Sequence, residues 1–407
     1  MSGLGRALLR SVPRSMATAA PMLLSTLVFG IPIAGQVDST MAQEGIYDRP
    51  FIASASSTSI GGYVEGNTNY FVEDGVSEGF SMELRRFNIF MYSSISQRVR
   101  FLSELEFEHG TEEIALETAL IDVQISPALV LRAGIILPPI GYLNQNHDSP
   151  KWDFVDRPLV TTGVIPSTLS EVGVGLYGKS ASGGLMLSYD VYVTNGMSDA
   201  VIGNDLGRTD IPSGKSEEQF EEDNNGSPAI SGRLAVRRPG LGEVGLSYYG
   251  GYYNSYLFEG VEIDDRRWLG ITAVDFGASV GRADIRGEVA YATIEVPAGM
   301  SDIFGSRQWG GHLDIVAPVW KPTLGGYADA TLSLGLRLEH VDYNRGTFAS
   351  TGGSIRDDVT ALVPGISFRP TAGTVFRANY RYHWTNDFVG NPTARAAGFQ
   401  VGFATYF

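Results

Sequence analysis

The sequence predicts an all-β protein: a transmembrane antiparallel β-barrel of about 16 strands, with a long third outer loop folded into the lumen. Three observations predict this fold. Apolar and polar residues alternate along segment after segment, the connections between segments alternate between short and long, and the chain ends in an aromatic strand. After the N-terminal region, no stretch offers the roughly 18 consecutive apolar residues that a membrane helix needs.

The composition limits the classes of function. The chain has 407 residues, 45 acidic against 30 basic side chains, a formal charge of −15 and no cysteine. The acidic balance argues against a nucleic-acid partner, and the lack of cysteine excludes disulfides and thiolate metal sites. A soluble chain of this length would usually split into two or three domains, yet no linker divides it. We therefore expect one unit.

The N terminus reads as an export signal. Arg6, Arg10 and Arg14 precede an apolar run over residues 19–34, which is the charged region and the apolar region of a signal peptide. A membrane anchor is the alternative, which the short length of the run and its prolines disfavour. The predicted domains are a signal peptide with a possible short lead-in over residues 1–42, cleaved after residue 35 or 42, an N-terminal lead-in over 43–58 and the barrel over 59–407.

Sixteen strands follow. The first seven are predicted at 59–71, 82–94, 99–109, 114–125, 129–136, 171–178 and 185–194. The other nine are predicted at 230–237, 244–253, 267–277, 282–295, 308–319, 331–343, 358–369, 374–384 and 393–407. Short turns such as 96–97 and 371–373 mostly alternate with long connections such as 195–229 and 345–356, although 320–330 is long for its place. Tight periplasmic turns and longer outer loops are typical of outer-membrane barrels.

The strands alternate apolar and polar residues with a period of two. Leu334 and Leu336 face one way, and Arg337 and Glu339 face the other. A soluble barrel would bury the apolar face, whereas a barrel in lipid turns it outward and keeps the charges in a wet interior. Aromatic residues near strand ends favour lipid, because they match interfacial girdles: Tyr248, Tyr252, Trp268, Trp309, Trp320, Tyr380, Tyr382 and Trp384.

The connection over residues 137–170 has no strand or helix period but is rich in apolar side chains, including Trp152 and Phe154. A loop of this length is normally functional or disordered, and the apolar content argues for packing. In lipid every strand needs two neighbours, so the sheet closes, and a closed sheet of this size leaves a water channel. We therefore expect this loop to fold into the lumen and narrow the pore.

The last strand carries an alternating aromatic face of Phe399, Phe403 and Phe407. This pattern resembles the C-terminal signal by which outer-membrane barrels are recognised for assembly. An ordinary apolar last strand is the alternative.

Four motifs resemble the phosphate-selective porin O and P family: LRAG at 131–134 leading into PPIG at 138–141, WDFVDRP at 152–158 and ELRRFNI at 83–89. The resemblance implies a sixteen-stranded, usually trimeric outer-membrane porin with its third outer loop as the constriction. Phosphate-selective members carry an arginine ladder and a lysine cluster along the channel. Here lysine occurs only at positions 151, 179, 215 and 321, so phosphate selectivity does not carry over.

The candidate pore-lining residues are charged side chains of the loop and of lumen-facing strand positions: Arg86, Arg100, Glu104, Arg132, His147, Asp148, Lys151, Asp153, Asp156, Arg157, Arg337, Arg377 and Arg381. Cations near the constriction opposite loop carboxylates would set a transverse field that orients small polar solutes. The alternative is that these charges tie the loop to the barrel wall through ion pairs, and both can hold at once.

Other candidate sites are weaker. The acidic run over residues 217–223 could bind the divalent cations that bridge lipopolysaccharide, or could simply be a solvated loop. The five histidines lack the spacing of a zinc site. A barrel enzyme of the phospholipase kind would need a serine beside His340, the one histidine on the lipid side, and none pairs with it.

The sequence thus predicts an outer-membrane porin for passive diffusion of small hydrophilic solutes or ions, with no cofactor, no metal and no enzymatic activity. An anion- or phosphate-selective channel remains an alternative, as does a plugged barrel that acts as a surface binding or structural protein. The expected partners are solutes, outer-membrane lipid, lipopolysaccharide and further copies in a homotrimer.

Overall fold

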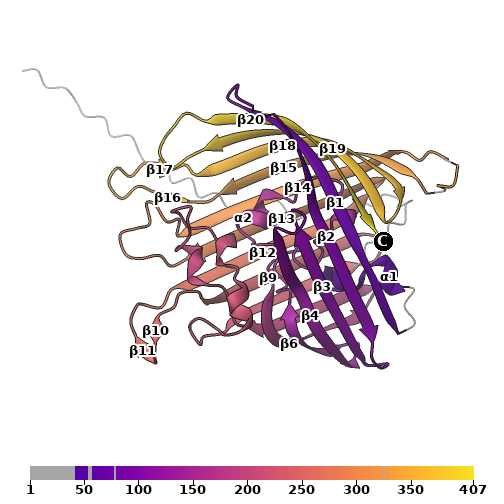
Figure 1. The fold of residues 1–407 in the computed structure, drawn as a ribbon, viewed down its shortest axis with the longest axis horizontal. Helices are drawn as coiled ribbons and strands as arrows, with labels where there is room; N and C mark the ends of the chain where they lie inside the picture. The colour runs from indigo at the N-terminus through magenta and orange to yellow at the C-terminus, as the bar shows by residue number, and fades with distance from the viewer. Residues whose placement is uncertain (1–41, 54–56, 78, 324, 328) are drawn as a thin grey trace, which may run out of the picture.

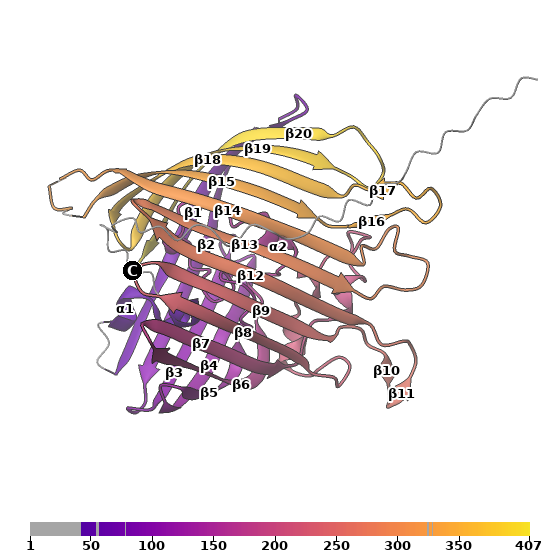
Figure 2. The same ribbon diagram turned by 180° about the vertical axis from the view of Figure 1, so that it is seen from behind.

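The computed structural model describes residues 42–53, 57–77, 79–323, 325–327 and 329–407. Sixteen strands of this part of the chain form one closed antiparallel barrel, in which β20 pairs with β1 (Figures 1 and 2). Their bounds are β1 Thr58–Glu73, β2 Phe80–Ser94, β3 Val99–Glu108, β4 Glu113–Ser126, β5 Leu129–Ile136, β6 Glu171–Ser182, β7 Leu185–Thr194, β8 Ala229–Arg238, β9 Gly242–Tyr252, β12 Trp268–Val280, β13 Ala283–Ile294, β14 Arg307–Trp320, β15 Thr331–Asp342, β18 Asp358–Thr371, β19 Thr374–Asn386 and β20 Ala394–Tyr406. The predicted barrel is confirmed.

Most of the long connections lie at one end of the barrel, and the β14–β15 connection at the other end is the exception. The connections at the first end carry two small hairpins, β10 (Leu257–Phe258) with β11 (Val261–Glu262) and β16 (Gly346–Thr347) with β17 (Ser354–Ile355). Figure 1 shows these hairpins at the left, opposite the C terminus. We call the end with the hairpins the outer end and the other the periplasmic end, following outer-membrane barrels. The connection from β5 to β6 is the third at the outer end, as predicted.

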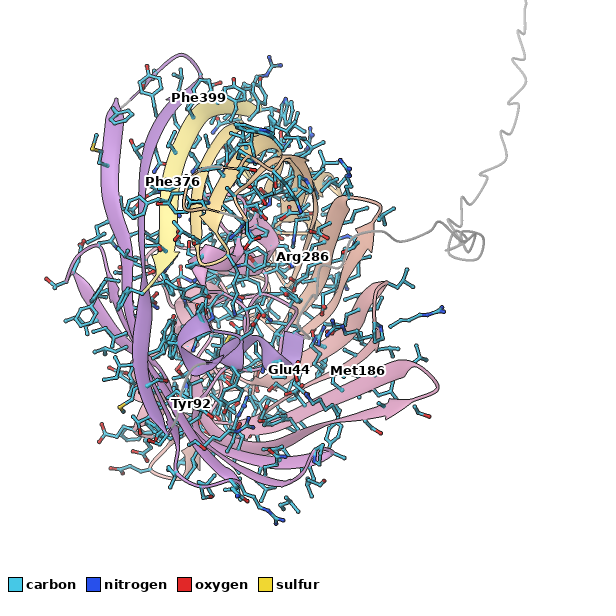
Figure 3. All side chains as sticks on the ribbon, turned by 90° about the vertical axis from the view of Figure 1, so that its right-hand side faces the viewer. Glu44, Tyr92, Met186, Arg286, Phe376 and Phe399 are labelled. Carbon is cyan, nitrogen blue, oxygen red and sulfur yellow. The ribbon has the colours of Figure 1, made fainter. Side chains whose placement is uncertain are left out.

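The outer face of the barrel is apolar and the inner face polar. Leu334 and Leu338 on β15 are 51% and 45% exposed, whereas the intervening Arg337 is 1% exposed. Phe376 and Phe399 likewise point outward from the sheet (Figure 3). A barrel in lipid turns its leucines outward and its arginines inward, as here, whereas a soluble barrel would bury the leucines.

Leu336 lies near the middle of β15 on this outer face. We expect Leu336→Arg to lower the free energy of unfolding in lipid vesicles by about 2–4 kcal/mol, because a charge would then face the acyl chains at mid-bilayer. Urea unfolding followed by fluorescence measures this change. Leu336→Ala is the matched control, and an equal loss in both variants would contradict the lipid-facing assignment.

Two β-bulges shift the alternation on one side of the barrel. The pairing of β1 with β2 slips at Glu65, and that of β3 with β4 slips at Glu104. The first slip lets the adjacent Arg85 and Arg86 both reach inward, and the second turns Glu117 inward. The bulges therefore concentrate charge on the lumenal side of β2 and β4.

Three segments fill much of the lumen. The first is residues 42–53, with η1 (Ala42–Tyr47) and α1 (Pro50–Ala53). The second is the β5–β6 connection, with η2 (Ser149–Lys151) and α2 (Leu159–Gly163), and the third is the β7–β8 connection, with η3 (Asp199–Val201), η4 (Pro212–Gly214) and η5 (Glu217–Phe220). In Figure 3, seen from the periplasmic end, Glu44 lies within the ring of strands.

The entry of residues 42–53 into the lumen has no counterpart in the sequence pattern, which indicated only a lead-in over 43–58. Ile46 packs in an apolar cluster with Leu102 and Leu120, which face the lumen from β3 and β4. The predicted signal peptide over residues 1–42 lies outside the described residues, apart from Ala42. No helix in the described chain is long and apolar enough to span a membrane.

Candidate pore constriction

The β5–β6 connection, which we call the constriction loop (residues 137–170), packs against a patch of the wall that is lined by glycines. Phe154 is 2% exposed and lies over the glycines of β15 and β18. A Cβ atom on Gly335 would lie 2.8 Å from Phe154 Cζ, and one on Gly365 would lie 3.2 Å from its Cε1. These positions need glycine because the ring approaches the backbone directly. The guanidinium of Arg337 lies over a face of the ring, 4.4 Å from its centroid.

Wall guanidinium groups hold the loop by its carbonyl and carboxylate oxygens. Arg337 donates from Nη1 to the Asp156 carbonyl at 2.7 Å. Arg377 donates from Nη1 to the Phe154 carbonyl at 2.9 Å, and its Nη2 lies 3.1 Å from Glu65. Asp153 pairs with Arg369 at 3.1 Å, on the periplasmic side of the loop. These contacts are the wall-tying role that the sequence left as one of two alternatives.

The N-terminal segment, residues 42–53, binds the loop from the periplasmic side. Arg49 donates from Nε and Nη2 to both carboxylate oxygens of Asp148, at 2.8 and 2.9 Å, and pairs with Glu104 at 3.0 Å. Lys151 donates from Nζ to the Gly45 carbonyl at 2.7 Å. Arg49, Asp148 and Glu104 are each almost fully buried, so all three charges depend on one another for stability.

Arg132 and Arg100 form the wall beneath the same segment. Arg132 makes two hydrogen bonds of 2.8 Å to Asp122, its register partner on β4. Among the described residues, the nearest carboxylate to Arg100 is Asp122 at 3.6 Å, and the Arg100 guanidinium stacks over Tyr47, 4.5 Å from the ring centroid. The Tyr47 hydroxyl donates to Asp122 at 2.6 Å. Arg100 therefore contacts the N-terminal segment directly, and Arg132 is joined to it through Asp122.

His147 lies in a buried acidic cluster. Its Nε2 is 3.4 Å from Glu104 and 3.2 Å from Glu117. Burial lowers the pKa of His147, but these two carboxylates outweigh burial and raise the pKa to about 10. Burial raises the pKa of Asp148, but Arg49 and then Lys151 bring it well below its usual range. Positive charges of the loop and of the N-terminal segment thus neutralise this cluster.

The same cluster has the donor atoms of a metal site, since ligand atoms of Glu104, His147 and Asp148 lie within 4.8 Å of one another. The guanidinium of Arg49 already contacts both carboxylates. A divalent cation would have to displace it, so we assign no metal here.

The space left in the lumen divides at the constriction loop. An outer cavity of about 610 Å³ lies between the loop, β2 to β4 and the β7–β8 connection. A periplasmic cavity of about 420 Å³ lies on the other side, beside Lys151, Asp153 and Arg286. Between them, a space of about 10 Å³ shares Arg85 and Arg157 with the outer cavity and Trp152 with the periplasmic one. Side chains that line the two larger cavities therefore meet around this small space, beside the constriction loop.

The predicted residues fall into two groups. Arg86, Asp156, Arg157 and Arg381 line the outer cavity. Arg86 pairs with Glu65, Glu106 and Glu108, and Asp156 pairs with Arg85 and Arg381. The others serve chiefly as ties between the loop, the wall and the N-terminal segment, and of these Lys151 and Asp153 also line the periplasmic cavity.

Sequence reasoning missed Arg49, Arg85, Glu117 and Lys215. Arg49 carried no signal, because only the fold brings it to Asp148. Arg85 and Glu117 did carry one, since the exposed apolar positions change phase from even to odd after Leu84 and after Leu116. Such a phase change marks a bulge and turns neighbouring side chains inward.

Comparison with known proteins agrees with this architecture. The structure superposes on an anion-selective porin from Comamonas acidovorans with a TM-score of 0.55 and 13% identity, covering 86% of this chain and 99% of that one. OmpT of Vibrio cholerae, an outer membrane protein solved in a trimer form, superposes with a TM-score of 0.53 and 11% identity, covering 86% of this chain and 100% of that one. OmpF of Salmonella typhi superposes with a TM-score of 0.53 and 11% identity, covering 86% of this chain and 98% of that one. The likeness is one of fold.

The sequence matches no protein-family model. It is 31% identical over 366 residues to an uncharacterized protein of Aquifex aeolicus (strain VF5), covering 83% of this chain and 78% of that protein. The chain therefore belongs to the same family as this Aquifex aeolicus protein, and its fold is the 16-stranded barrel of outer-membrane porins.

Proposed function

We propose that the protein is an outer-membrane porin through which small hydrophilic solutes and ions diffuse passively. One observation carries the proposal: cavities lined by charged side chains lie on both sides of the constriction loop, with only a small space between them, which we call the waist, inside a closed barrel whose outer face is apolar. Size and charge at the waist would then set permeability. The purified protein in planar lipid bilayers tests this directly, and we expect stepwise ion currents.

The cavity charges bear on ion preference. The outer cavity is lined by five cationic and five acidic side chains: Arg85, Arg86, Arg157, Lys215 and Arg381 with Glu106, Glu108, Glu113, Glu117 and Asp156. The periplasmic cavity is lined by three cationic and six acidic side chains: Lys151, Arg286 and Arg369 with Asp48, Asp153, Glu243, Asp275, Asp284 and Asp314. Arg337 pairs with Asp314, and Arg233 pairs with Asp275 and Glu243, from behind this lining. A smaller excess of carboxylates remains, which attracts cations and repels anions.

We therefore expect a cation preference, measured as the sign of the reversal potential under a KCl gradient across the bilayer. The preference should weaken as salt rises, because screening shortens the reach of the carboxylates. A reversal potential of anion-selective sign would instead support the finer resemblance to phosphate-selective porins.

A second candidate function rests on the waist itself. A space of about 10 Å³ is enough for about one water molecule. A barrel that stays this narrow would act as a surface binding or structural protein. The bilayer experiment separates the two, because a plugged barrel would insert without passing current.

Three further properties belong to the same proposal. Residues 1–42 would act as the export signal that takes the chain to the outer membrane. The protein would form a homotrimer, as suggested by the trimer form of OmpT. The exposed Glu221 and Glu222 of the β7–β8 connection would meet cation-bridged lipopolysaccharide. The mass of the detergent-solubilised particle tests the trimer.

A further inference from the structure

The outer cavity holds charged groups of both signs that the network around it leaves without a salt bridge. Within the described side chains, no carboxylate lies within 4.0 Å of the Arg157 guanidinium or the Lys215 amine. Arg157 donates from Nη1 to Thr168 Oγ1 at 3.1 Å, while its buried Nη2 has no hydrogen-bond partner in the same part of the structure. This nitrogen is a donor in need of an acceptor.

A second donor in the cavity lacks a partner. Ser167, from the end of the constriction loop, is 6% exposed and lines the cavity, and its buried Oγ makes no hydrogen bond to any described residue. Buried hydroxyl groups are nearly always hydrogen-bonded. Arg157, Ser167 and Lys215 together offer one guanidinium, one hydroxyl and one ammonium group, which is a donor set suited to a carboxylate.

The acidic side of the cavity comes from β4. Glu113 is exposed and forms no salt bridge within the described chain. Glu117 is 7% exposed, and although its Oε2 lies 3.2 Å from His147, that oxygen receives no well-aligned hydrogen bond from a described residue. By contrast, Arg86 neutralises Glu106 and Glu108 on β3. Glu113 thus retains its full acceptor capacity for a cationic group, and Glu117 lies on the same strand with His147 as its ionic partner.

An anion in this cavity would meet the carboxylates of β4, and a cation would meet Arg157 and Lys215, so each would gain one contact and suffer one repulsion. A solute carrying both charges avoids this conflict. The cavity volume of about 610 Å³ lies within the roughly 300–1,000 Å³ of small-molecule sites.

We propose that the outer cavity binds small zwitterionic solutes, namely amino acids and short peptides, with the solute carboxylate at Arg157, Ser167 and Lys215 and the ammonium group at Glu113 and Glu117. This rests on the proposed channel function and names the substrate class of the channel. The cavity would act as a capture site above the waist, where both solute charges are held before passage.

The test is equilibrium binding to the full detergent-solubilised barrel, measured by saturation-transfer NMR. The probes are triglycine, N-acetyltriglycine and triglycinamide, which share a backbone but carry both charges, only the negative charge and only the positive charge. We expect triglycine to bind about tenfold or more tightly than either blocked peptide, because each of those loses a set of charge-assisted hydrogen bonds. Equal binding of all three would overturn the proposal.

Variants assign the two ends of the solute. Arg157→Gln should weaken the binding of triglycine about tenfold or more and leave the binding of triglycinamide unchanged, because only a carboxylate needs the guanidinium. Glu113→Gln should weaken the binding of triglycine and leave the binding of N-acetyltriglycine unchanged, because N-acetyltriglycine has no ammonium group. Lys215→Gln repeats the first test if Arg157→Gln does not fold, and Glu262→Gln, on the exposed β10–β11 hairpin, should change none of the three. Unchanged triglycine binding in both site variants would refute the assignment.

The binding measurement does not depend on ion flow. If the barrel binds triglycine but carries no current, the channel proposal is refuted and the binding-site proposal is supported. A barrel that conducts but does not distinguish the three peptides would end the site proposal alone.

Discussion

Deletion of residues 43–53 is expected to raise the single-channel conductance several-fold. This segment fills the periplasmic side of the lumen below the constriction loop and joins the loop through Arg49, Lys151 and Gly45. Its removal leaves the loop attached to the wall by Arg337 and Arg377, so the opening widens while the barrel stays closed. Recordings in planar bilayers measure the change.

The single substitution Arg49→Ala should produce part of the same rise. It leaves Asp148 and Glu104 buried with an incomplete set of positive partners, which is costly in a site that water scarcely reaches. Arg266→Ala is the matched control, because Arg266 is half-exposed near the β10–β11 hairpin. If the deletion and Arg49→Ala both conduct like the unaltered protein, the N-terminal segment does not obstruct the pore.

The wall beneath this segment supports the same expectation. A water-filled channel is lined by polar side chains, yet Leu102 and Leu120 face the lumen and are fully buried. Ile46 covers them. Exposing these leucines to water would cost about 1.5–3 kcal/mol for each side chain, so the segment and the patch stabilise each other.

The strands and their closure could be predicted because a period of two is a local signal. Each strand reports which residues face lipid, and lipid forces the sheet to close. The constriction loop could be predicted from its length and its apolar content, since Phe154 and Val160 had to pack against something. Both inferences needed only neighbouring residues.

The partners of the lumenal charges could not be predicted in the same way. Parity places Arg132 and Glu104 in the lumen but does not say that one meets Asp122 and the other Arg49. Arg49 pairs with a residue 99 positions away, and its segment is too short and too mixed in character to show a period. Because these charges neutralise one another in pairs, the transverse electric field across the pore is weaker than the number of lumenal arginines and carboxylates indicated.

Arg337→Met is expected to cost about 3–5 kcal/mol of barrel stability, because it leaves the Asp314 carboxylate buried without its partner. Arg337 is 1% exposed and makes two hydrogen bonds of 2.7 Å to Asp314 across β14 and β15. It also donates to the Asp156 carbonyl and covers the Phe154 ring. Urea unfolding in lipid vesicles measures the loss, and current noise should rise as the constriction loop loses this anchor.

The double variant Arg337→Met with Asp314→Leu separates the buried charge from the lost packing. Replacing both members of a buried pair by apolar side chains of similar size is often close to neutral, so most of the lost stability should return. The current noise should not return to its original level, because neither substitution restores the hydrogen bond to the Asp156 carbonyl. Arg395→Met, at an exposed outer position, controls for the loss of an arginine. If the double variant were as unstable as the single one, the cost would come from the packing around Phe154 and not from an unpaired carboxylate.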